Sequence, residues 1–250
     1  SADGTVDLAS DQRAPAAALP GGETSDDPRA LTVQSDGKLV AAGRAFHSLQ
    51  SWGLAVARYQ PDGNLDPTFG DGGRVMTPLR TQTQGEAVAL VVQPDGMLVV
   101  AADVRPSHFR SSDLVLARYR HDGSLDPGFG IDGMTSTDFD GAWQGTSALL
   151  PLPDGGFLVG GRARMDEVAL ARFDGHGLLD LSFGHVGMVT TGLDAGGFSL
   201  VEVPAMATAP HGSIVAAASL RGSLTLVRWN ADGTLDPRFG TDGIARLSTS

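Results

Sequence analysis

The chain has 250 residues, of which 41% are hydrophobic and 19% charged, so it is long enough to bury the core of one large domain or two small ones. Its net charge of −11 repels phosphate backbones, and we therefore expect no nucleic acid among its partners. No apolar run approaches the roughly 18 residues of a membrane span, which predicts no membrane insertion, and the absence of cysteine excludes disulfides and thiolate catalysis.

The first 29 residues differ from the rest of the chain. Residues 2–7 (ADGTVD) are similar to residues 231–236 (ADGTLD) near the C-terminus. We therefore predict an N-terminal partial repeat and linker over residues 1–29. Residues 30–250 are predicted to form one repeat domain.

Four segments of that domain align with one another, which identifies a repeat protein. They share an Ala-Arg-aromatic or Val-Arg-aromatic motif, a turn with glycine, and an Asp that lies three residues before a Phe-Gly pair. The aligned segments are residues 54–70, 114–130, 168–184 and 224–240. Because the phenylalanines recur every 54 to 60 residues, each unit is about 57 residues long.

Each unit reads as four short strands. In the first unit, apolar runs at 30–33, 38–42, 54–59 and 74–76 are separated by turns rich in Asp, Gly and Pro. No segment of ten or more residues has helical periodicity. The pattern predicts an all-β protein, a β-propeller built from four four-stranded antiparallel blades. A β-solenoid is the alternative architecture, although its repeats are usually shorter.

The motif Pro-Asp-Gly-x-Leu-Val-x-Ala, followed by Ala-Arg-Tyr-x-x-Asp-Gly-x-Leu-Asp-x-x-Phe-Gly, resembles the delta-60 repeat family of bacterial propeller-like proteins. The resemblance covers residues 30–250 and implies a fold, not a reaction. Two units depart from the motif: the third has His176-Gly177 and Leu181, and the fourth has His211 in its first turn. A role that needs all four aspartates is therefore not implied.

The recurring side chains have a structural explanation. We predict that Phe69, Phe129, Phe183 and Phe239 are core residues, and that the same holds for Tyr59, Tyr119, Phe173 and Trp229. An arginine precedes an aspartate by eight residues in every unit, which predicts an ion pair across the turn. These pairs are Arg58–Asp66, Arg118–Asp126, Arg172–Asp180 and Arg228–Asp236.

The same turns have a second interpretation. Asp62, Asn64 and Asp66 have the Asp-x-Asn-x-Asp spacing of calcium loops, and Asp122, Asp126, Asp232 and Asp236 form weaker copies. No other cofactor is expected. The alternative is an Asx-turn, in which the aspartate accepts a hydrogen bond from the backbone two residues later.

The face opposite these turns is irregular, and irregular loops on a rigid scaffold often bind ligands. Between the second and third strands of each unit, these loops are expected to be long in units one and two and short in the other two. Their arginine, histidine and aromatic residues predict a ligand site. The candidates are Arg44, His47, Trp52, Arg105, His108, Phe109, Arg110 and Trp143.

No nucleophile elbow, zinc helix or phosphate loop is present in the sequence. We therefore expect a non-catalytic, extracytoplasmic binding module, secreted, periplasmic or on the cell surface, whose partner is a protein or a carbohydrate. The alternative is a propeller hydrolase or lyase with its site at the channel mouth near His47 and His108. A purely structural module is a third possibility. A homo-oligomer or a larger assembly is compatible with four blades, which is the low end for closing a ring.

Overall fold

The computed structural model describes residues 27–48, 51–79, 83–106, 112–137, 143–164, 167–193, 201–220 and 223–247. Over these residues the protein is all-β, with sixteen strands and one short 3-10 helix, η1 (Pro210–Gly212). Within the same residues no helix has the length and apolarity to cross a membrane. The predicted partial repeat at residues 1–29 lies outside this description except for its last three residues, which begin the first strand.

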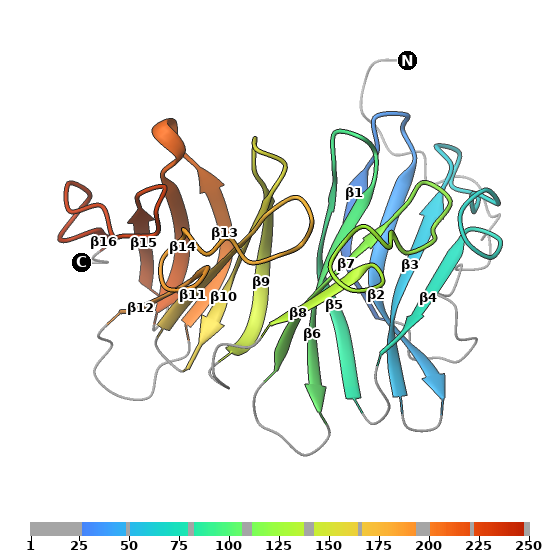
Figure 1. Cartoon of the computed structure of the whole chain (residues 1–250), viewed down its shortest axis with the longest axis horizontal. Helices are drawn as coiled ribbons and strands as arrows, with labels where there is room; N and C mark the ends of the chain where they lie inside the picture. Colours follow the sequence, from blue (N-terminus) through green and yellow to red (C-terminus); the bar gives the residue numbers. More distant parts are fainter. Residues whose placement is uncertain are drawn as a thin grey trace, which may run out of the picture.

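The strands form four antiparallel sheets, and in each sheet the spatial order follows the chain (Figure 1). This confirms the predicted four-stranded units. The first sheet contains β1 (Asp27–Val33), β2 (Leu39–Ser48), β3 (Ser51–Tyr59) and β4 (Arg74–Pro78), and the second contains β5 (Thr83–Val92), β6 (Leu98–Pro106), β7 (Asp113–Tyr119) and β8 (Met134–Thr137). The third contains β9 (Trp143–Pro151), β10 (Phe157–Ala163), β11 (Glu167–Phe173) and β12 (Met188–Gly192), and the fourth contains β13 (Val201–Thr208), β14 (Ile214–Leu220), β15 (Ser223–Trp229) and β16 (Ile244–Arg246).

The prediction of a long loop between the second and third strands of the first unit is wrong. The hairpin of β2 and β3 continues almost to its tip, with Phe46 paired to Trp52 and only residues 49 and 50 between the strands. Arg44 and His47 therefore lie on a strand.

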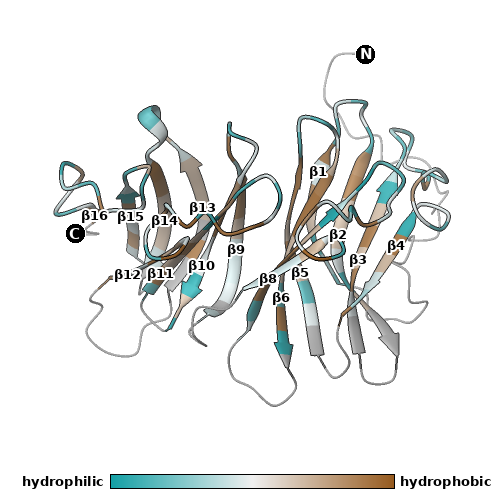
Figure 2. Ribbon diagram, viewed as in Figure 1, coloured by the Kyte–Doolittle hydropathy of each residue, from teal (hydrophilic) through white to brown (hydrophobic). Residues whose placement is uncertain are grey.

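Three apolar clusters join consecutive sheets, the first to the second, the second to the third, and the third to the fourth. The first strands of neighbouring sheets, β1, β5, β9 and β13, contact one another in series and so lie on the inner edge of the arrangement. Figure 1 shows the first and fourth sheets at opposite ends of the molecule, and Figure 2 shows apolar strand segments where sheets face each other. In the described residues the four sheets thus form an open arc.

The predicted aromatic core is confirmed for the interior of this arc. Phe69, Phe129 and Phe183 are at most 1% exposed, but Phe239 is only half-buried. Tyr119, Phe173 and Trp229 are also buried, whereas Tyr59 is half-buried. The two exceptions have one cause, because Phe239 belongs to the last sheet and Tyr59 to the first, and among the described residues no further sheet packs against either of them.

Two hydrogen bonds recur at each junction between units. In the first, the arginine at the end of the third strand donates from Nη1 to a turn carbonyl of the following unit: Arg58 to His121 (2.8 Å), Arg118 to Gly175 (2.7 Å) and Arg172 to Ala231 (3.2 Å). In the second, the glycine after the phenylalanine donates its N–H to the next carbonyl of the same turn: Gly70 to Asp122, Gly130 to His176 and Gly184 to Asp232. One contact pattern therefore joins all consecutive units.

Candidate functional site

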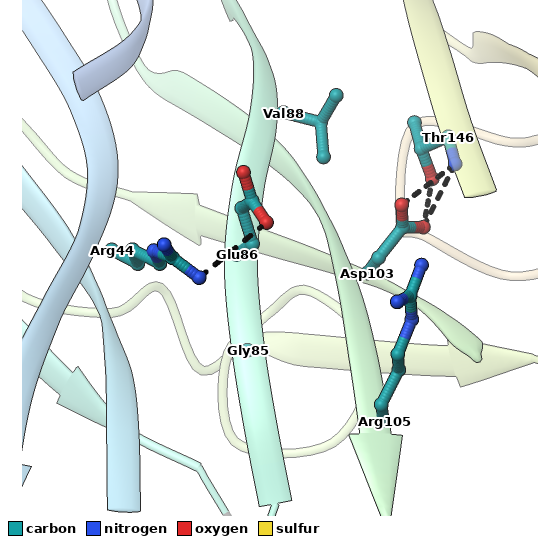
Figure 3. Close-up of a pocket in the computed structure, with 7 residues that line it drawn as sticks. All are labelled: Arg44, Gly85, Glu86, Val88, Asp103, Arg105 and Thr146. Carbon is teal, nitrogen blue, oxygen red and sulfur yellow. Dashed lines mark hydrogen bonds and ion pairs between the residues drawn. The ribbon is translucent and has the colours of Figure 1, made fainter. Parts of the chain in front are cut away.

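A polar pocket of about 250 Å³ lies where the first three sheets meet, at the end of the units opposite the Asp-Gly turns. Its walls come from the inner strands β5 and β9 and from the second strands β2 and β6 (Figure 3). Two residues of the predicted ligand set, Arg44 and Arg105, are brought together here. The remaining lining residues are Gly85, Glu86, Val88, Asp103 and Thr146.

Asp103 joins the second sheet to the third through hydrogen bonds. Its carboxylate accepts hydrogen bonds from the Thr146 N–H (2.8 Å), the Thr146 hydroxyl (2.7 Å) and the indole N–H of Trp143 (3.1 Å). Hydrogen bonds to a charged acceptor are stronger than neutral ones. The carboxylate is therefore held in place as part of the pocket wall.

Glu86 belongs to a network of charges between the first and second sheets. It pairs with Arg29 at 2.7 Å and, more loosely, with Arg44 at 3.9 Å. Both arginines also pair with Asp27, at 2.9 and 3.5 Å. Two positive and two negative groups therefore balance one another beside the pocket.

Arg105 differs from the other charged groups of the pocket. Its Nε donates to the hydroxyl of Ser112 at 2.8 Å, and Ser112 is buried, which fixes the stem of the side chain. Within the described part of the chain, its two terminal nitrogens donate no hydrogen bond. A guanidinium held in this way presents donors to a carboxylate or another oxygen-bearing group.

The other predicted ligand residues do not join this pair. Trp143 is fully buried between the second and third sheets, so it supports the pocket from behind and does not reach a surface ligand. His47 and Trp52 lie on β2 and β3, but their side chains are outside the described residues, as are the loop residues His108, Phe109 and Arg110.

Sequence reasoning missed Glu86, Asp103 and Thr146. A signal was present for Asp103, because it follows an uninterrupted apolar run at residues 97–102 in a predicted strand. A carboxylate in a strand of this kind needs a partner on a neighbouring element. Nothing in the sequence shows that Thr146 of another unit is that partner.

On the opposite face, the turns proposed for calcium have Asx-turn geometry. The Asp62 carboxylate accepts the N–H of Asn64 at 3.0 Å, and this bond lowers the pKa of Asp62. Asp122 and Asp232 make the same bond to Ser124 and Thr234. No cluster of three or more acidic or histidine side chains suited to a metal is found among the described residues. Calcium binding at these turns stays a prediction.

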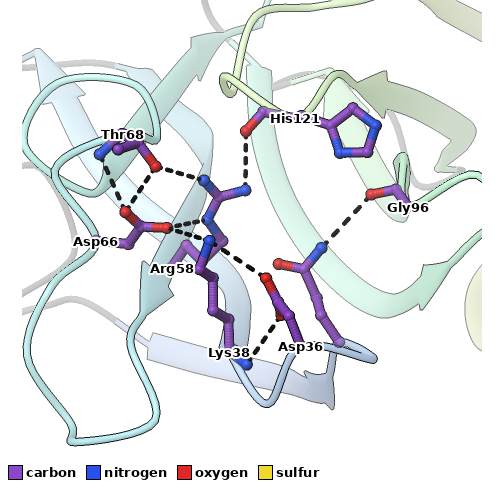
Figure 4. A network of polar contacts seen from close by, with 8 residues as sticks. Asp36, Lys38, Arg58, Asp66, Thr68, Gly96 and His121 are labelled. Carbon is purple, nitrogen blue, oxygen red and sulfur yellow. Dashed lines mark hydrogen bonds and ion pairs between the residues drawn. The ribbon is translucent and has the colours of Figure 1, made fainter.

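The predicted ion pairs across the turn are present in all four units, with nitrogen–oxygen distances of 2.8, 2.6, 3.1 and 3.2 Å in chain order. Figure 4 shows the ion pair of the first unit. The Asp66 carboxylate pairs with Arg58 and Lys38 and accepts hydrogen bonds from the N–H and the hydroxyl of Thr68. Burial alone would raise the pKa of the Asp66 carboxyl. The hydrogen bonds from Thr68 and Lys38 and the charge of Arg58 outweigh burial and hold the pKa well below its usual value.

Acid should therefore destabilise the protein. Folding lowers the pKa of Asp66, Asp126 and Asp180, so in acid the folded state binds fewer protons than the unfolded state. The free energy of unfolding should have its full value above the unfolded carboxyl pKa of about 4 and fall as the pH drops further towards the folded values. Urea denaturation between pH 7 and pH 3 measures this. The destabilisation caused by Asp66→Asn should shrink below pH 4. If the difference in unfolding free energy between this variant and the wild type did not change with pH, the pKa of Asp66 would not contribute to the acid sensitivity.

One comparison with known proteins, that with family models, agrees with the architecture. A family model described as a domain of unknown function (DUF5122) beta-propeller matches residues 34–69 and 93–129, which lie in the first two units. No curated protein matches the chain. Among solved structures, the chain is similar to the native arabinanase Arb43A of Bacillus subtilis, with a TM-score of 0.44 and 13% identity over 92% of this chain and 82% of that one. The family match shows that the chain carries β-propeller repeats, and the delta-60 name stays a resemblance.

Proposed function

We propose that the protein is a non-catalytic, secreted or cell-surface binding module that takes an acidic sugar at the pocket between Arg44 and Arg105. The observation that carries the proposal is the fixed guanidinium of Arg105, whose terminal donors face a polar pocket. A carboxylate with hydroxyl groups beside it, as in a uronic acid, matches these donors and the neighbouring polar groups. The pocket volume of about 250 Å³ suits one sugar-sized group.

The hydrogen bonds of Asp103 and the ion pair of Glu86, the two carboxylates of the pocket, favour a binding role over hydrolysis. General acid–base catalysis needs a group that can exchange a proton with the substrate. Asp103 already accepts hydrogen bonds from Thr146 and Trp143, and Glu86 is paired with Arg29. The hydrolase or lyase alternative depended on His47 and His108, whose side chains lie outside the described residues.

Isothermal titration with oligogalacturonate and oligoglucuronate tests the proposal. We expect saturable binding to at least one of them, and Arg105→Ala should weaken it about tenfold or more, because a hydrogen bond to a charged group is lost. Arg164→Ala is the matched control. Arg164 follows β10 at the same end of the third unit, is exposed and, among the described residues, pairs with Glu167 alone, so this variant should bind as the wild type does.

Two results would contradict the proposal. Binding to neither uronate would overturn the ligand class. Shortened oligosaccharides after prolonged incubation, detected by chromatography, would overturn the non-catalytic role.

A further inference from the structure

The junction between units is built three times from the same parts. We call the face of a sheet that packs on the following unit its rear and the face that packs on the preceding unit its front. The rear supplies a phenylalanine, an arginine donor and a glycine N–H. The front of the next sheet supplies an aromatic residue, two turn carbonyls and a glycine. The approach is close, since a Cβ on Gly177 would lie 2.6 Å from the ring of Phe129. Each half of the junction is therefore complementary to the other half and not to itself.

In the part of the chain that the structure describes, no other sheet packs on the front half of the first sheet, which we term the front end face. Leu31 is 69% exposed and Val33 60% exposed, whereas Leu90, the counterpart of Leu31 in the second sheet, is buried. The carbonyls of Pro61 and Asp62 accept no hydrogen bond from any described residue. The apolar members of the front end face are Leu31, Val33, Leu39, Ala41 and Tyr59.

Likewise, no described sheet packs on the rear half of the fourth sheet, which we term the rear end face. Leu224 is 46% exposed, although its counterparts Leu54 and Leu114 are buried in junctions. In the described chain, Nη1 of Arg228 and the N–H of Gly240 reach no acceptor. The apolar members of the rear end face are Val215, Ala217, Leu224, Leu226 and Phe239.

We infer that the rear end face of one copy packs on the front end face of a second copy and repeats the internal junction between chains. Arg228 and Gly240 would then donate to the carbonyls of Pro61 and Asp62, as Arg58 and Gly70 donate to His121 and Asp122. A junction between two different faces of one molecule joins copies head to tail and can close a ring. Two copies supply eight sheets, which is within the range of closed propellers.

Sedimentation equilibrium of the full chain over about 1–100 µM tests the inference. We expect a dimer of twice the 25.8 kDa chain mass. Gly63→Asn blocks the front end face: in one copy a Cβ at Gly63 meets open space, but at the internal counterpart Gly123 it would lie 2.8 Å from the Gly70 nitrogen. Leu224→Glu blocks the rear end face with a charge. Each should raise the dimer dissociation constant by about 100-fold or more.

Gly72→Asn is the matched control for the front variant. Gly72 also has a positive φ, its Cβ would meet open space, and the next unit has Asp132 at positive φ at the same place. Asparagine tolerates this conformation, so both glycine variants should fold. The control should dimerise as the wild type does, and circular dichroism checks the fold of all three variants.

Mixing the two blocked variants provides a sharper test. The Gly63→Asn chain retains its rear end face and the Leu224→Glu chain its front end face, so the mixture should form a dimer joined at one junction although each variant alone is monomeric. A monomeric wild type would overturn the inference. A dimer that survives both substitutions would also overturn the inference. If that dimer were lost on deletion of residues 1–26, the N-terminal segment, and not the opposite end face, would be what the end face binds.

Discussion

Arg58→Met should lower the free energy of unfolding by about 3–5 kcal/mol, measured by urea denaturation at pH 7 and low protein concentration. The substitution removes the closer of the two cations that pair with Asp66, which is 2% exposed, and leaves Lys38 at 3.3 Å as its one remaining cation among the described residues. Removing one partner of a buried ion pair has about this cost. It also removes the hydrogen bond to the His121 carbonyl, which joins the first unit to the second, and the guanidinium that lies 4.6 Å from the centre of the Phe69 ring.

Arg172→Met is the matched control within the chain. Arg172 occupies the equivalent position in the third unit, but it and its partner Asp180 are 23% and 26% exposed. Solvent screens this pair, so its loss should cost only about 1 kcal/mol. Equal losses for the two variants would show that burial does not set the strength of these pairs.

Phe129→Ala should cost about 3–5 kcal/mol, because it opens a cavity between the second and third sheets. The ring is fully buried, packs edge-on against Phe157 with centroids 6.2 Å apart, and lies 4.7 Å from the Arg118 guanidinium. The second and third sheets cannot close over the cavity, because the hydrogen bonds from Arg118 and Gly130 to the third unit hold them at a fixed distance. Thermal or urea denaturation gives the change in stability.

The control for this prediction is Leu181→Ala. Leu181 lies in the equivalent turn of the third unit and is 70% exposed, so its truncation should change stability by less than about 0.5 kcal/mol. If Phe129→Ala were as mild as Leu181→Ala, the sheets would not be held together by the buried phenylalanines.

The repeat pattern predicted the architecture because every local signal agreed. The Asp-Gly turns set the hairpins, the apolar alternation set the strands, and the eight-residue spacing of Arg58 and Asp66 brought their charges together across one turn. These features lie within a single unit, where residues close in sequence are also close in space. Sequence reasoning succeeded for them for that reason.

The pocket could be predicted only in part. The sequence predicts Arg44 and Arg105 as ligand residues but not Asp103 and Thr146, since the contact of the latter two joins positions 43 residues apart in different units. The sequence predicts Trp143 as a ligand residue, whereas the structure buries its side chain fully. Whether an aromatic residue next to a loop points outward or into the neighbouring sheet depends on packing that the local pattern does not encode.

The sequence by itself determined the unit: four strands, their turns and the ion pair of each repeat. Only the tertiary structure decided how the units are arranged, because the same phenylalanine is buried at Phe69 and half-buried at Phe239 although both have nearly the same neighbours in the chain. The physical reason is that burial of these positions comes from the adjacent sheet. The repeat specifies a junction with two complementary halves, and in the described residues the arc leaves one half open at each end.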